Sequence, residues 1–589
     1  MLRTHNCGEL RANLAGEQVK LAGWVHHKRH HGGVLFVDLR DRYGRTQLTF
    51  KPESKELFER AEKIGHETVI SITGTVTVRP PEARNPELLT GEIEVIIENM
   101  QVLSIAETPP FVIEDEVKAS EETRLKYRYL DLRRPEMRDT MILRSKASRI
   151  TRNFLFDEDF LEIETATLVR STPEGARDFL VPSRMQKGKF YALPQSPQVY
   201  KQLLMISGFD RYFQLARCYR DEDLRADRQL EFTQIDIEMS FIDENDILSL
   251  AERLLAKLLS KLSGVNLKLP IPRISYDKAM LLYGSDKPDL RYGLEIHDIS
   301  ELAKTSEFRV FSSAVKSDGA VRGICVPGGA ALSRKQIDEL TSKAQKLGAK
   351  GLAYTKFENG EFVGGISKFL SENEIAGIRT DFDPPENSII VFVADSIKIC
   401  ERVLGVMRVD LAHSLGLIPE NAWEAHFIVD FPMFEEEEDT GRLVARHHAF
   451  TQPKPEDLHL LETEPSLVHA RAYDLVLNGH EIAGGSIRTH DSDLLARVLS
   501  VIELTEEKAR EKFGFLLDAM KYGAPPHGGI AFGYDRMIML IAGRNSIRDV
   551  IPFPKTTAGQ SLMDNCPNTV DPEQLDELGI KIEKGENAE

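Results

Sequence analysis

Cysteine is scarce in this chain of 589 residues. The cysteines are scattered, at Cys7, Cys218, Cys325, Cys400 and Cys566. Because no two of them form a Cys-x-x-Cys pair, the sequence argues against a disulfide framework and against a structural zinc site. Apolar runs long enough to cross a bilayer are also missing, and the first residues contain no apolar signal segment. These absences predict a cytoplasmic protein that has no membrane partner.

The chain also carries fewer positive than negative charges. The formal net charge is −18 at pH 7, which at first sight disfavours a nucleic-acid partner. Net charge does not decide the question, because phosphate contacts need only a local basic patch. The sequence has such a patch in the run His-His-Lys-Arg-His-His at positions 26–31. Any nucleic-acid surface is therefore expected to be confined to places such as this one.

The chain is too long for a single hydrophobic core, so three or four domains are expected. Residues 1–105 contain short apolar and β-branched segments between Gly-rich turns, with one helical segment near 55–63. The expected strands are 19–25, 34–40, 46–50, 68–74 and 92–97. Five strands and one helix are typical of an OB-type β-barrel, a fold that binds nucleic acids.

The rest of the chain mixes helical and strand patterns, so we expect a multidomain α+β protein. Residues 106–135 open with Pro109-Pro110 and become strongly charged, which indicates a hinge. Apolar residues between 247 and 258 recur at helical spacing and predict a core-facing helix. The candidate catalytic residues stop at Glu238 and resume at His447, so the two parts of the catalytic domain are expected at 136–286 and 425–565. The block between them, 287–424, suggests no chemistry and looks like an inserted α/β domain, and the polar tail, 566–589, is expected to fray.

The stretch from 220 to 238 carries the strongest chemical signal. Arg220-Asp-Glu222 is followed by a charged loop and by a strictly alternating segment at 231–238. Arg220 and Glu222 are expected to share one face of the first strand. Alternation places three polar side chains on one face of the second: Gln234, Asp236 and Glu238. A solvated sheet face is the alternative for this segment alone, because amphipathic strands alternate in the same way.

These segments resemble the signature motifs of the class II aminoacyl-tRNA synthetases. Arg220-x-Glu222 is similar to their motif 2, and Gly529-Ile-Ala-Phe-Gly-Tyr-Asp-Arg536 is similar to motif 3. Four further segments resemble the bacterial-type aspartyl-tRNA synthetases: RLKYRYLDLRR at 124–134, PEGARD at 173–178, QSPQVYK at 195–201 and YGSDKPDLR at 283–291. The resemblance covers nearly the whole chain. It implies a catalytic domain built on an antiparallel sheet, with a domain inserted into it and an anticodon-binding barrel before it.

The implied activity is that of an aspartate–tRNA ligase, which works in two steps. The carboxylate of L-aspartate attacks the α-phosphorus of ATP, and the terminal ribose of the tRNA then takes the aspartyl group. Because the nucleophile is already a carboxylate, positioning and charge stabilisation matter more than a protein base. The expected cofactors are ATP and Mg²⁺. The expected partners are L-aspartate, tRNA-Asp, tRNA-Asn and a second copy of the chain.

The resemblance implies a nucleotide site built on two arginines. Arg220 is expected to clamp the α-phosphate, since a guanidinium offers paired donors. Arg536 follows a glycine and precedes an apolar helix, and is expected to reach the far phosphates. With Glu481 they form the expected catalytic set. The other expected ATP-binding residues are Asp221, Glu222, Gln229, Gly533, Tyr534 and Asp535. A surface ion pair between Arg220 and Glu222 is the alternative.

The amino-acid site is expected around Gln198 and Lys201, which lie three residues apart on one helical face. Ser196 is the expected N-cap of that helix, and Pro197 its first residue. The resemblance implies that Lys201 and Arg488 meet the side-chain carboxylate of aspartate, while a solvated lysine is the alternative. It also assigns to the amino acid the residues Glu174, Gln198, Arg220, Asp236, for the ammonium group, and His447, which we prefer to its neighbour His448.

Glu481 and Asp474 are the expected metal ligands, although a structural role suits Asp474 as well. Glu481 and Arg488 lie seven residues apart, so a regular strand would place them on opposite faces. The pair Gly484-Gly485 could supply a bulge that re-aims one of them.

Discrimination between tRNA-Asp and tRNA-Asn depends on the last anticodon base, which is expected to lie against the loop 26–33 between the first two strands. Family members of relaxed specificity tend to carry histidine just before the glycine pair, as His31 here, where restricted members carry leucine. An imidazole can stack on or bond to either base. Relaxed members also commonly carry glycine in a later loop, where this chain has Glu82-Ala83. We expect both tRNAs to be charged, and strict tRNA-Asp specificity is the alternative.

Three other points remain. Class II motif 1 normally carries a proline where this chain has Ala166. In the family that proline lies near the dimer interface.

An asparagine- or lysine-specific relative is disfavoured by the inserted domain and by the paired cations Lys201 and Arg488. A catalytically inactive tRNA-binding paralogue should lack Arg220, Glu481 or Arg536, and all three are present.

Overall fold

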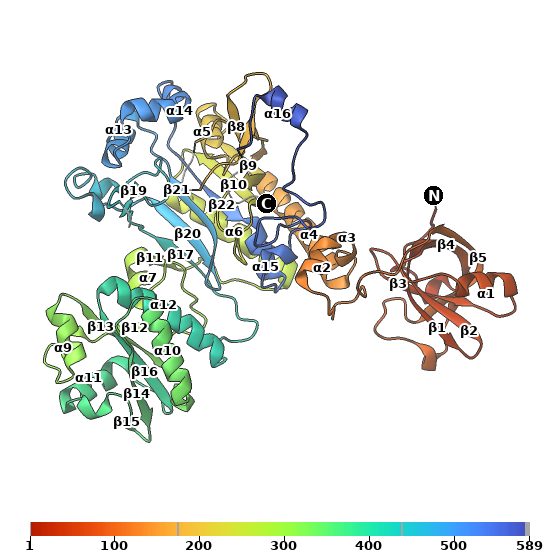
Figure 1. Ribbon diagram of the computed structural model, residues 1–589, viewed down its shortest axis with the longest axis horizontal. Coiled ribbons are helices and arrows are strands. Elements are labelled where there is room, and N and C mark those ends of the chain that lie inside the picture. Colours follow the sequence, from red (N-terminus) through yellow and green to blue (C-terminus); the bar gives the residue numbers. More distant parts are fainter. Residues whose placement is uncertain (1, 173–175, 438–439, 584–589) are drawn as a thin grey trace. The chain divides into compact units, whose positions relative to one another are not determined.

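The computed structural model describes residues 2–172, 176–437 and 440–583. The chain forms two compact units (Figure 1). Unit 1 consists of Met1–Ile142 with Pro552–Asn568, and unit 2 of Leu143–Ile551 with Thr569–Glu589. Every helix in the described ranges is too short or too polar to span a membrane.

Unit 1 contains a closed five-stranded barrel, whose strands pair in the order β1-β2-β3-β5-β4. The strands are β1 (Gln18–His31), β2 (Val34–Arg40), β3 (Arg45–Phe50), β4 (Val69–Val78) and β5 (Ile93–Ser104). Alternate residues of each strand, such as Val19, Leu21 and Ile72, fill the barrel core. Helix α1 (Lys55–Glu62) follows β3. The expected five strands and one helix are confirmed.

Residues 26–31 form the end of strand β1 rather than the expected loop. His31 pairs with Val34, so only Gly32 and Gly33 make the turn to β2. Both glycines have positive φ, 58° and 79°, as a two-residue hairpin turn requires. The register shifts between Val25 and His27, which makes His26 the extra residue of a β-bulge. A hairpin pairs almost to its turn, which is why the strand extends farther than its apolar pattern.

The segment after the barrel is irregular at first and then helical. Helices α2 (Glu121–Lys126) and α3 (Arg128–Asp131) precede the long helix α4 (Pro135–Asp157). The carboxylate of Asp131 is fully buried and accepts hydrogen bonds from Arg128 at 2.6 Å and Arg134 at 2.9 Å. The charged residues after 120 therefore form a packed cluster, and they are not a featureless hinge.

Unit 2 is built on an eight-stranded sheet in the order β11-β17-β20-β21-β22-β10-β9-β6. Its strands are β6 (Leu161–Glu162), β9 (Arg211–Tyr219), β10 (Glu231–Ser240), β11 (Arg273–Ser275), β17 (Ala425–Val429), β20 (Ala472–Leu477), β21 (His480–Ile487) and β22 (His527–Gly533). The six central strands are antiparallel, and only the edge pairs β11–β17 and β6–β9 are parallel. The expected antiparallel sheet is confirmed.

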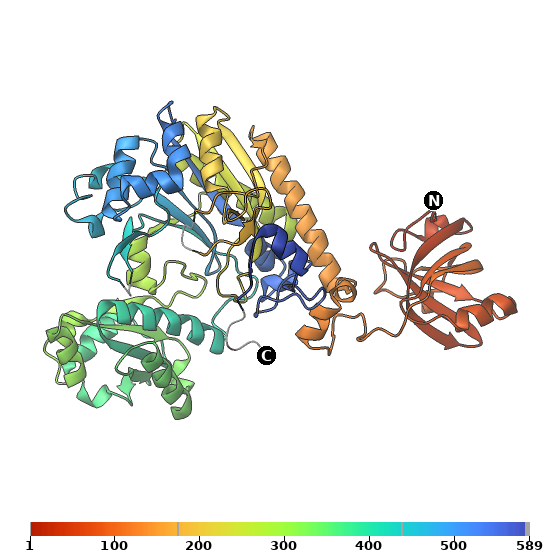
Figure 2. The ribbon, with the colours of Figure 1, turned by 45° about the horizontal axis from the view of Figure 1, so that its top comes forward.

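Helices α4, α6 (Glu244–Ser263) and α15 (Tyr534–Ile541) share one apolar core with this sheet. Figure 2 shows α4 as the long orange helix beside it. The buried residues of α6 include Ile247, Leu250 and Leu254, as predicted. The other elements of unit 2 around the sheet are α5 (Gln198–Ile206), α7 (Tyr276–Tyr283), α13 (Ser492–Val501), α14 (Glu506–Met520), and the two hairpins β7 (Leu180–Pro182)–β8 (Phe190–Ala192) and β18 (Phe434–Glu436)–β19 (Leu443–Ala445).

The inserted block has its own five-stranded antiparallel sheet, in the order β12-β13-β16-β14-β15. Its elements are β12 (Ile296–Asp298), α8 (Ser300–Ala303), α9 (Arg309–Lys316), β13 (Ala320–Val326), α10 (Arg334–Lys346), β14 (Ala353–Glu358), β15 (Glu361–Val363), α11 (Glu372–Phe382), β16 (Ser388–Asp395) and α12 (Ile397–Ser414). Arg408 of α12 is buried and donates to the backbone carbonyls of Asp289 at 2.9 Å and Leu294 at 3.2 Å. This contact anchors α12 to the segment that leads into the insertion.

The polar tail contains one helix, α16 (Pro572–Leu578), where the sequence predicted fraying. A proline at the first turn and a left-handed Gly579 at the C-terminal end are favourable helix boundaries. These local signals outweigh the polar composition.

Candidate active site

The sheet of unit 2 presents a polar face on the side opposite its apolar core. Ile235 and Ile237 of β10 pack into the core, and Asp236 and Glu238 point to the other side. The predicted alternation is confirmed, but the acidic side chains are fully buried rather than solvated. Buried carboxylates need cationic partners. Cationic side chains are therefore expected beside Asp236 and Glu238.

A cleft of about 190 Å³ lies at one end of this face. Its lining has residues from the loop between β9 and β10, from the start of β10 and from β21, β22 and α15: among them Arg220, Glu222, Gln229, Gln234, Glu481, Gly533, Asp535 and Arg536. Most of the predicted nucleotide residues are thus brought together, although they lie more than 300 positions apart in sequence.

The two arginines of the cleft are held without being neutralised by a buried acid. Arg220 stacks over the ring of Phe232, with its guanidinium carbon 5.1 Å from the ring centroid. Arg536 donates to the backbone carbonyl of Glu481 and lies 3.1 Å from Asp227. The Nε atoms of both arginines are buried and find no hydrogen-bond partner among the described residues. Such preorganised donors suit an anion that enters from solution.

Five residues predicted for the nucleotide differ from the expectation in their placement or contacts. Arg220 and Glu222 do not share a strand face, because β9 ends at Tyr219 and both lie in the loop. Asp221 is outside the cleft lining and lies 3.8 Å from Arg177. Tyr534 is buried on the core side, where its hydroxyl lies 2.6 Å from Ser148. Asp535 reaches the cleft wall, but it is occupied by Arg144 and by the backbone N–H of Thr233 at 2.7 Å.

Asp474 and Glu481 form an acidic pair beside the cleft. A β-bulge brings Glu481 to the site face: Leu475 pairs with Ala483 and Val476 with Glu481, so Ile482 is the extra residue. The bulge lies two residues before the predicted Gly484-Gly485. Its effect is as expected, because one extra residue lets positions seven apart share a face. Burial, and then Glu481, raise the pKa of Asp474 well above its ordinary value.

Next to this pair lies a buried cluster of four charges. Lys201 Nζ is 2.7 Å from Asp236 Oδ1 and 3.2 Å from Glu238 Oε2. Arg488 donates two parallel hydrogen bonds to Glu238, at 2.9 and 3.0 Å. All four side chains are almost fully buried. The two cations predicted for a substrate carboxylate, Lys201 and Arg488, therefore converge on Glu238 in a buried region.

The charges in the cluster are set by competition between burial and pairing. Burial raises the pKa of Glu238, but Arg488 and Lys201 outweigh it and lower that pKa to about 2. For Asp236 burial is the stronger effect, and its pKa lies above the ordinary value in spite of Lys201. Asp236 Oδ2 and Gln198 Nε2 are buried, with no partner in the described part of the chain. These atoms are free to contact a polar ligand.

His448, rather than the predicted His447, touches the charge cluster. Its Nε2 lies against Arg488 Nη1 and 3.3 Å from Ser486 Oγ. His447 packs edge-on against Phe431, with ring centroids 4.7 Å apart. Burial and the neighbouring arginines lower the pKa of both histidines, to about 4 for His447. Two adjacent histidines in the sequence do not reveal which of them reaches the charge cluster, because that depends on what each ring packs against in the fold.

Three further site residues were given no role from the sequence. Glu238 binds both cations, and its strict alternation with Asp236 was the available signal. Asp227 pairs with Arg536 across a loop, and Ser486 accepts a hydrogen bond from Arg488 at 2.6 Å; no sequence pattern indicates either contact. Helix α5 begins at Gln198 with Pro197 as its cap and no side-chain capping bond, so the predicted Ser196 cap is wrong by one residue. Glu174 lies outside the described residues.

The barrel of unit 1 carries a polar cluster of its own. Arg29 lies 3.1 Å from Asp38 and 3.2 Å from Gln47, whose amide donates to Glu94 at 3.1 Å. Arg79 is buried nearby with two nitrogens that find no partner in the described ranges. The predicted specificity residues His31, Glu82 and Ala83 are exposed. Exposed and open polar groups of this kind can bind base edges.

Comparison with known proteins decides the family. A family model described as "tRNA synthetases class II (D, K and N)" matches residues 120–557, well over half of the chain. The chain belongs to the class II tRNA synthetases. A second model, "OB-fold nucleic acid binding domain", matches residues 19–103 of this synthetase.

Individual relatives agree with this assignment. A protein from Syntrophomonas wolfei is 51% identical over 583 residues, 99% of this chain and 100% of the relative, and one from Caldanaerobacter subterraneus is 52% identical over 582 residues, 99% and 98%. Both are named aspartate–tRNA(Asp/Asn) ligase. The asparaginyl-tRNA synthetase of Pyrococcus horikoshii, solved with asparaginyl-adenylate, has a TM-score of 0.59 over 94% of this chain and 99% of its own, at 20% identity. The latter similarity supports the fold alone.

Gly529→Ala should disrupt the charge cluster of the synthetase. A Cβ atom there would lie 2.0 Å from Glu238 Oε2 and 2.2 Å from the carbonyl oxygen of Ile237, so Glu238 would have to leave Arg488. Overpacking of this kind typically costs about 1–3 kcal/mol. Denaturant unfolding should show that loss. Gly514→Ala is the control, because its Cβ would meet nothing within 4 Å in helix α14; equal midpoints for the two variants would contradict the packing argument.

Proposed function

We propose that this synthetase is an aspartate–tRNA ligase. It activates L-aspartate with ATP to aspartyl-adenylate and pyrophosphate, and it transfers the aspartyl group to the 3′ end of tRNA-Asp and tRNA-Asn. The observation that carries the amino-acid assignment is the convergence of Lys201 and Arg488 in one buried charge cluster, where both pair with Glu238. Two fixed cations favour a substrate with an anionic side chain and disfavour lysine as a substrate.

In this proposal the charge cluster forms the aspartate pocket. Asp236, with one buried oxygen open, accepts the ammonium group, and the Gln198 amide donates to the substrate. Lys201 and Arg488 bind the side-chain carboxylate. Glu238 holds the two cations in place, and His448 braces Arg488 from the other side. Asparagine has nearly the shape of aspartate, so selection between them depends on charge.

The cleft binds ATP in the same proposal. Arg220 lies on the α-phosphate, where charge develops as the carboxylate attacks, and Arg536 on the terminal phosphates. Glu222 and Gln229 line the cleft and contact the nucleotide. Asp227, which pairs with Arg536 at 3.1 Å, gives way to the phosphates when ATP binds.

Asp474 and Glu481 fit the Mg²⁺ that accompanies ATP. Both offer the oxygen donors that this ion requires. They flank a space that is kept free by Gly484, whose Cβ would lie 2.7 Å from Asp474 Oδ1 and 3.9 Å from Glu481 Oε1. When bound, the ion neutralises phosphate charge. The two carboxylates would hold the ion, and the backbone carbonyl of Glu481 also accepts from Arg536.

We also propose that the synthetase is a homodimer. Exposed apolar side chains gather around edge strand β6: Phe156 is 52% exposed and Leu161 49%. An apolar patch at a free sheet edge favours association with a second copy. Ala166, which takes the place of the usual motif 1 proline, follows this strand.

The assignment is tested by pyrophosphate exchange with aspartate, asparagine and lysine, followed by charging of tRNA-Asp and tRNA-Asn transcripts. We expect exchange with aspartate alone and charging of both tRNAs. Exchange that prefers asparagine or lysine would refute the amino-acid assignment and leave the nucleotide site untouched.

His31→Leu should shift the enzyme toward tRNA-Asp. His31 is exposed at the hairpin turn of β1 and β2, where an imidazole can stack on or bond to either final anticodon base and leucine offers shape alone. We expect charging of tRNA-Asn to fall about tenfold relative to tRNA-Asp, since lost base contacts cost about 1–3 kcal/mol. His5→Leu is the control on the same barrel. An unchanged ratio of the two charging rates would remove His31 from specificity.

A further inference from the structure

Two consecutive histidines of the barrel point to the same side of strand β1. Neighbouring residues of a regular strand point to opposite faces. The bulge at His26 breaks that rule, and the rings of His26 and His27 have centroids 4.2 Å apart. Bulges that re-aim a side chain are common next to functional sites. The pair therefore presents two imidazoles to one point in space.

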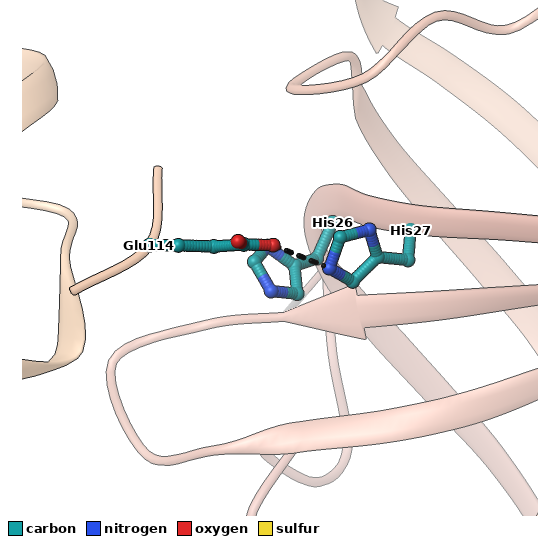
Figure 3. A group of neighbouring side chains, drawn as sticks. All are labelled: His26, His27 and Glu114. Atoms are coloured by element: carbon teal, nitrogen blue, oxygen red, sulfur yellow. Dashed lines mark ion pairs between the residues drawn. The ribbon is translucent and has the colours of Figure 1, made fainter. Parts of the chain in front are cut away.

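A carboxylate from the segment after the barrel meets these imidazoles. Glu114 Oε1 lies 3.0 Å from His27 Nε2, and one ligand atom from each of the three residues lies within 4.8 Å of the others (Figure 3). Ligand atoms about 2.1 Å from a tetrahedral metal ion are about 3.4 Å apart. The His27–Glu114 pair, at 3.0 Å, is close to this spacing, and a small rotation of side chains would bring in the third donor. His27 and Glu114 are 39% and 49% exposed on their side chains, so they are free to move.

The surroundings allow a bound cation. His26 and His27 line a cavity of about 640 Å³, which His66 and residues 106–113 also line and which leaves room for a water ligand. Arg40 contacts His26, but Glu67 accepts from Arg40 at 2.8 and 2.9 Å and neutralises it. The contact of Arg40 with His26 Nδ1, at 3.4 Å, is long for a hydrogen bond.

We propose that His26, His27 and Glu114 form a binding site for a divalent transition-metal ion of the zinc class, which fastens the segment 106–120 to the barrel. Two imidazoles and a carboxylate are a donor set that suits Zn²⁺ and its neighbours, whereas Mg²⁺ and Ca²⁺ prefer oxygen donors alone. The scarcity of cysteine does not exclude a site of this type. Residues 106–120 contain no helix or strand. A metal bond to Glu114, whose carbonyl also accepts from Arg134 at 2.9 Å, would restrain that segment.

The test is a calorimetric titration of the untagged full-length chain with Zn²⁺ in the presence of excess Mg²⁺, after removal of metals by a chelator. Cys566, the exposed cysteine, is replaced by serine in every variant so that it does not bind the ion. We expect one Zn²⁺ bound with micromolar or tighter affinity. His27→Ala and Glu114→Gln should each weaken it at least about tenfold.

His30→Ala is the matched control, because its ring lies on the same strand 3.8 Å from Glu62 and no third ligand is found there among the described residues. It should bind Zn²⁺ like the parent. Affinity that is equal in the parent, His27→Ala and Glu114→Gln would overturn the site, as would the absence of Zn²⁺ binding in the parent. Both substitutions fall on partly exposed side chains, so neither should prevent folding; buried His26 is left unchanged.

Limited proteolysis tests the fastening role separately. Zn²⁺ should slow cleavage within 106–120 in the parent and in His30→Ala, but not in Glu114→Gln. Cleavage that is as fast with Zn²⁺ as without it in the parent would refute the restraint of this segment.

Discussion

Lys201→Met is expected to remove most aspartate-dependent pyrophosphate exchange. Lys201 is the buried cation that pairs with both Asp236 and Glu238, and methionine keeps its length without its charge. Loss of one group from a preorganised polar site costs roughly 2–4 kcal/mol of barrier, which corresponds to a roughly 30- to 900-fold lower kcat/KM for aspartate. Discrimination against asparagine should fall with it, because the remaining pocket separates the two by shape.

Arg488→Ala should have a similar effect on kcat/KM for aspartate. This change also leaves Glu238 with Lys201 as its remaining cation partner among the described residues, so some loss of stability accompanies it. Thermal unfolding of each variant distinguishes a loss of stability from the loss of the cation that binds aspartate.

The control for Lys201→Met is Lys257→Met, which removes a partly exposed lysine 3.8 Å from Asp157. It should leave exchange unchanged. ATP binding should survive both Lys201→Met and Arg488→Ala. Near-normal aspartate-dependent exchange in a folded Lys201→Met variant would refute the aspartate pocket.

Arg536→Ala and Arg220→Ala are expected to damage the nucleotide side instead. Both guanidinium groups line the cleft with a buried Nε that finds no partner among the described residues. Loss of either donor set should lower the rate of exchange by about 10²–10³-fold. The affinity for tRNA should not change, because tRNA binding by the barrel depends on residues of unit 1.

Arg510→Ala is the matched control for the arginine variants. Arg510 is an exposed arginine of helix α14 that pairs with Glu506 at 3.2 Å, and its loss should be silent. Filter binding of tRNA and pyrophosphate exchange are measured on the same preparations. If Arg536→Ala lost tRNA affinity but kept exchange, the division of labour between the two units would be wrong.

Local sequence patterns predicted much of the fold. The five barrel strands and helices α1 and α6 follow from periodicity that depends on nearby residues. The end of β1 did not follow, because the pairing of His31 with Val34 comes from the hairpin partner and not from the polar run itself. The start of helix α5 was predicted one residue too early, because Ser196 makes no capping bond and the helix begins at Gln198.

The site was predictable as a set of residues, but its contacts were not. The motifs identified Lys201, Arg220, Arg488 and Arg536 as a group, and the sheet brings them to one face. That Tyr534 would point into the core and His448 would reach Arg488 depends on which side of the sheet each side chain packs. The local sequence around these residues does not indicate which side of the sheet that is.

The sequence by itself determined the class of the protein, the order of its domains and the residue types that carry charge into the site. Only the tertiary structure decided which charges meet. The bulge at Ile482 aligns Glu481 with Arg488, and the bulge at His26 aligns two histidines with Glu114. Both depend on a single extra residue in one strand relative to its partner. Strand pairing sets that register, and the energy of a pairing belongs to two segments at once, so neither segment encodes it alone.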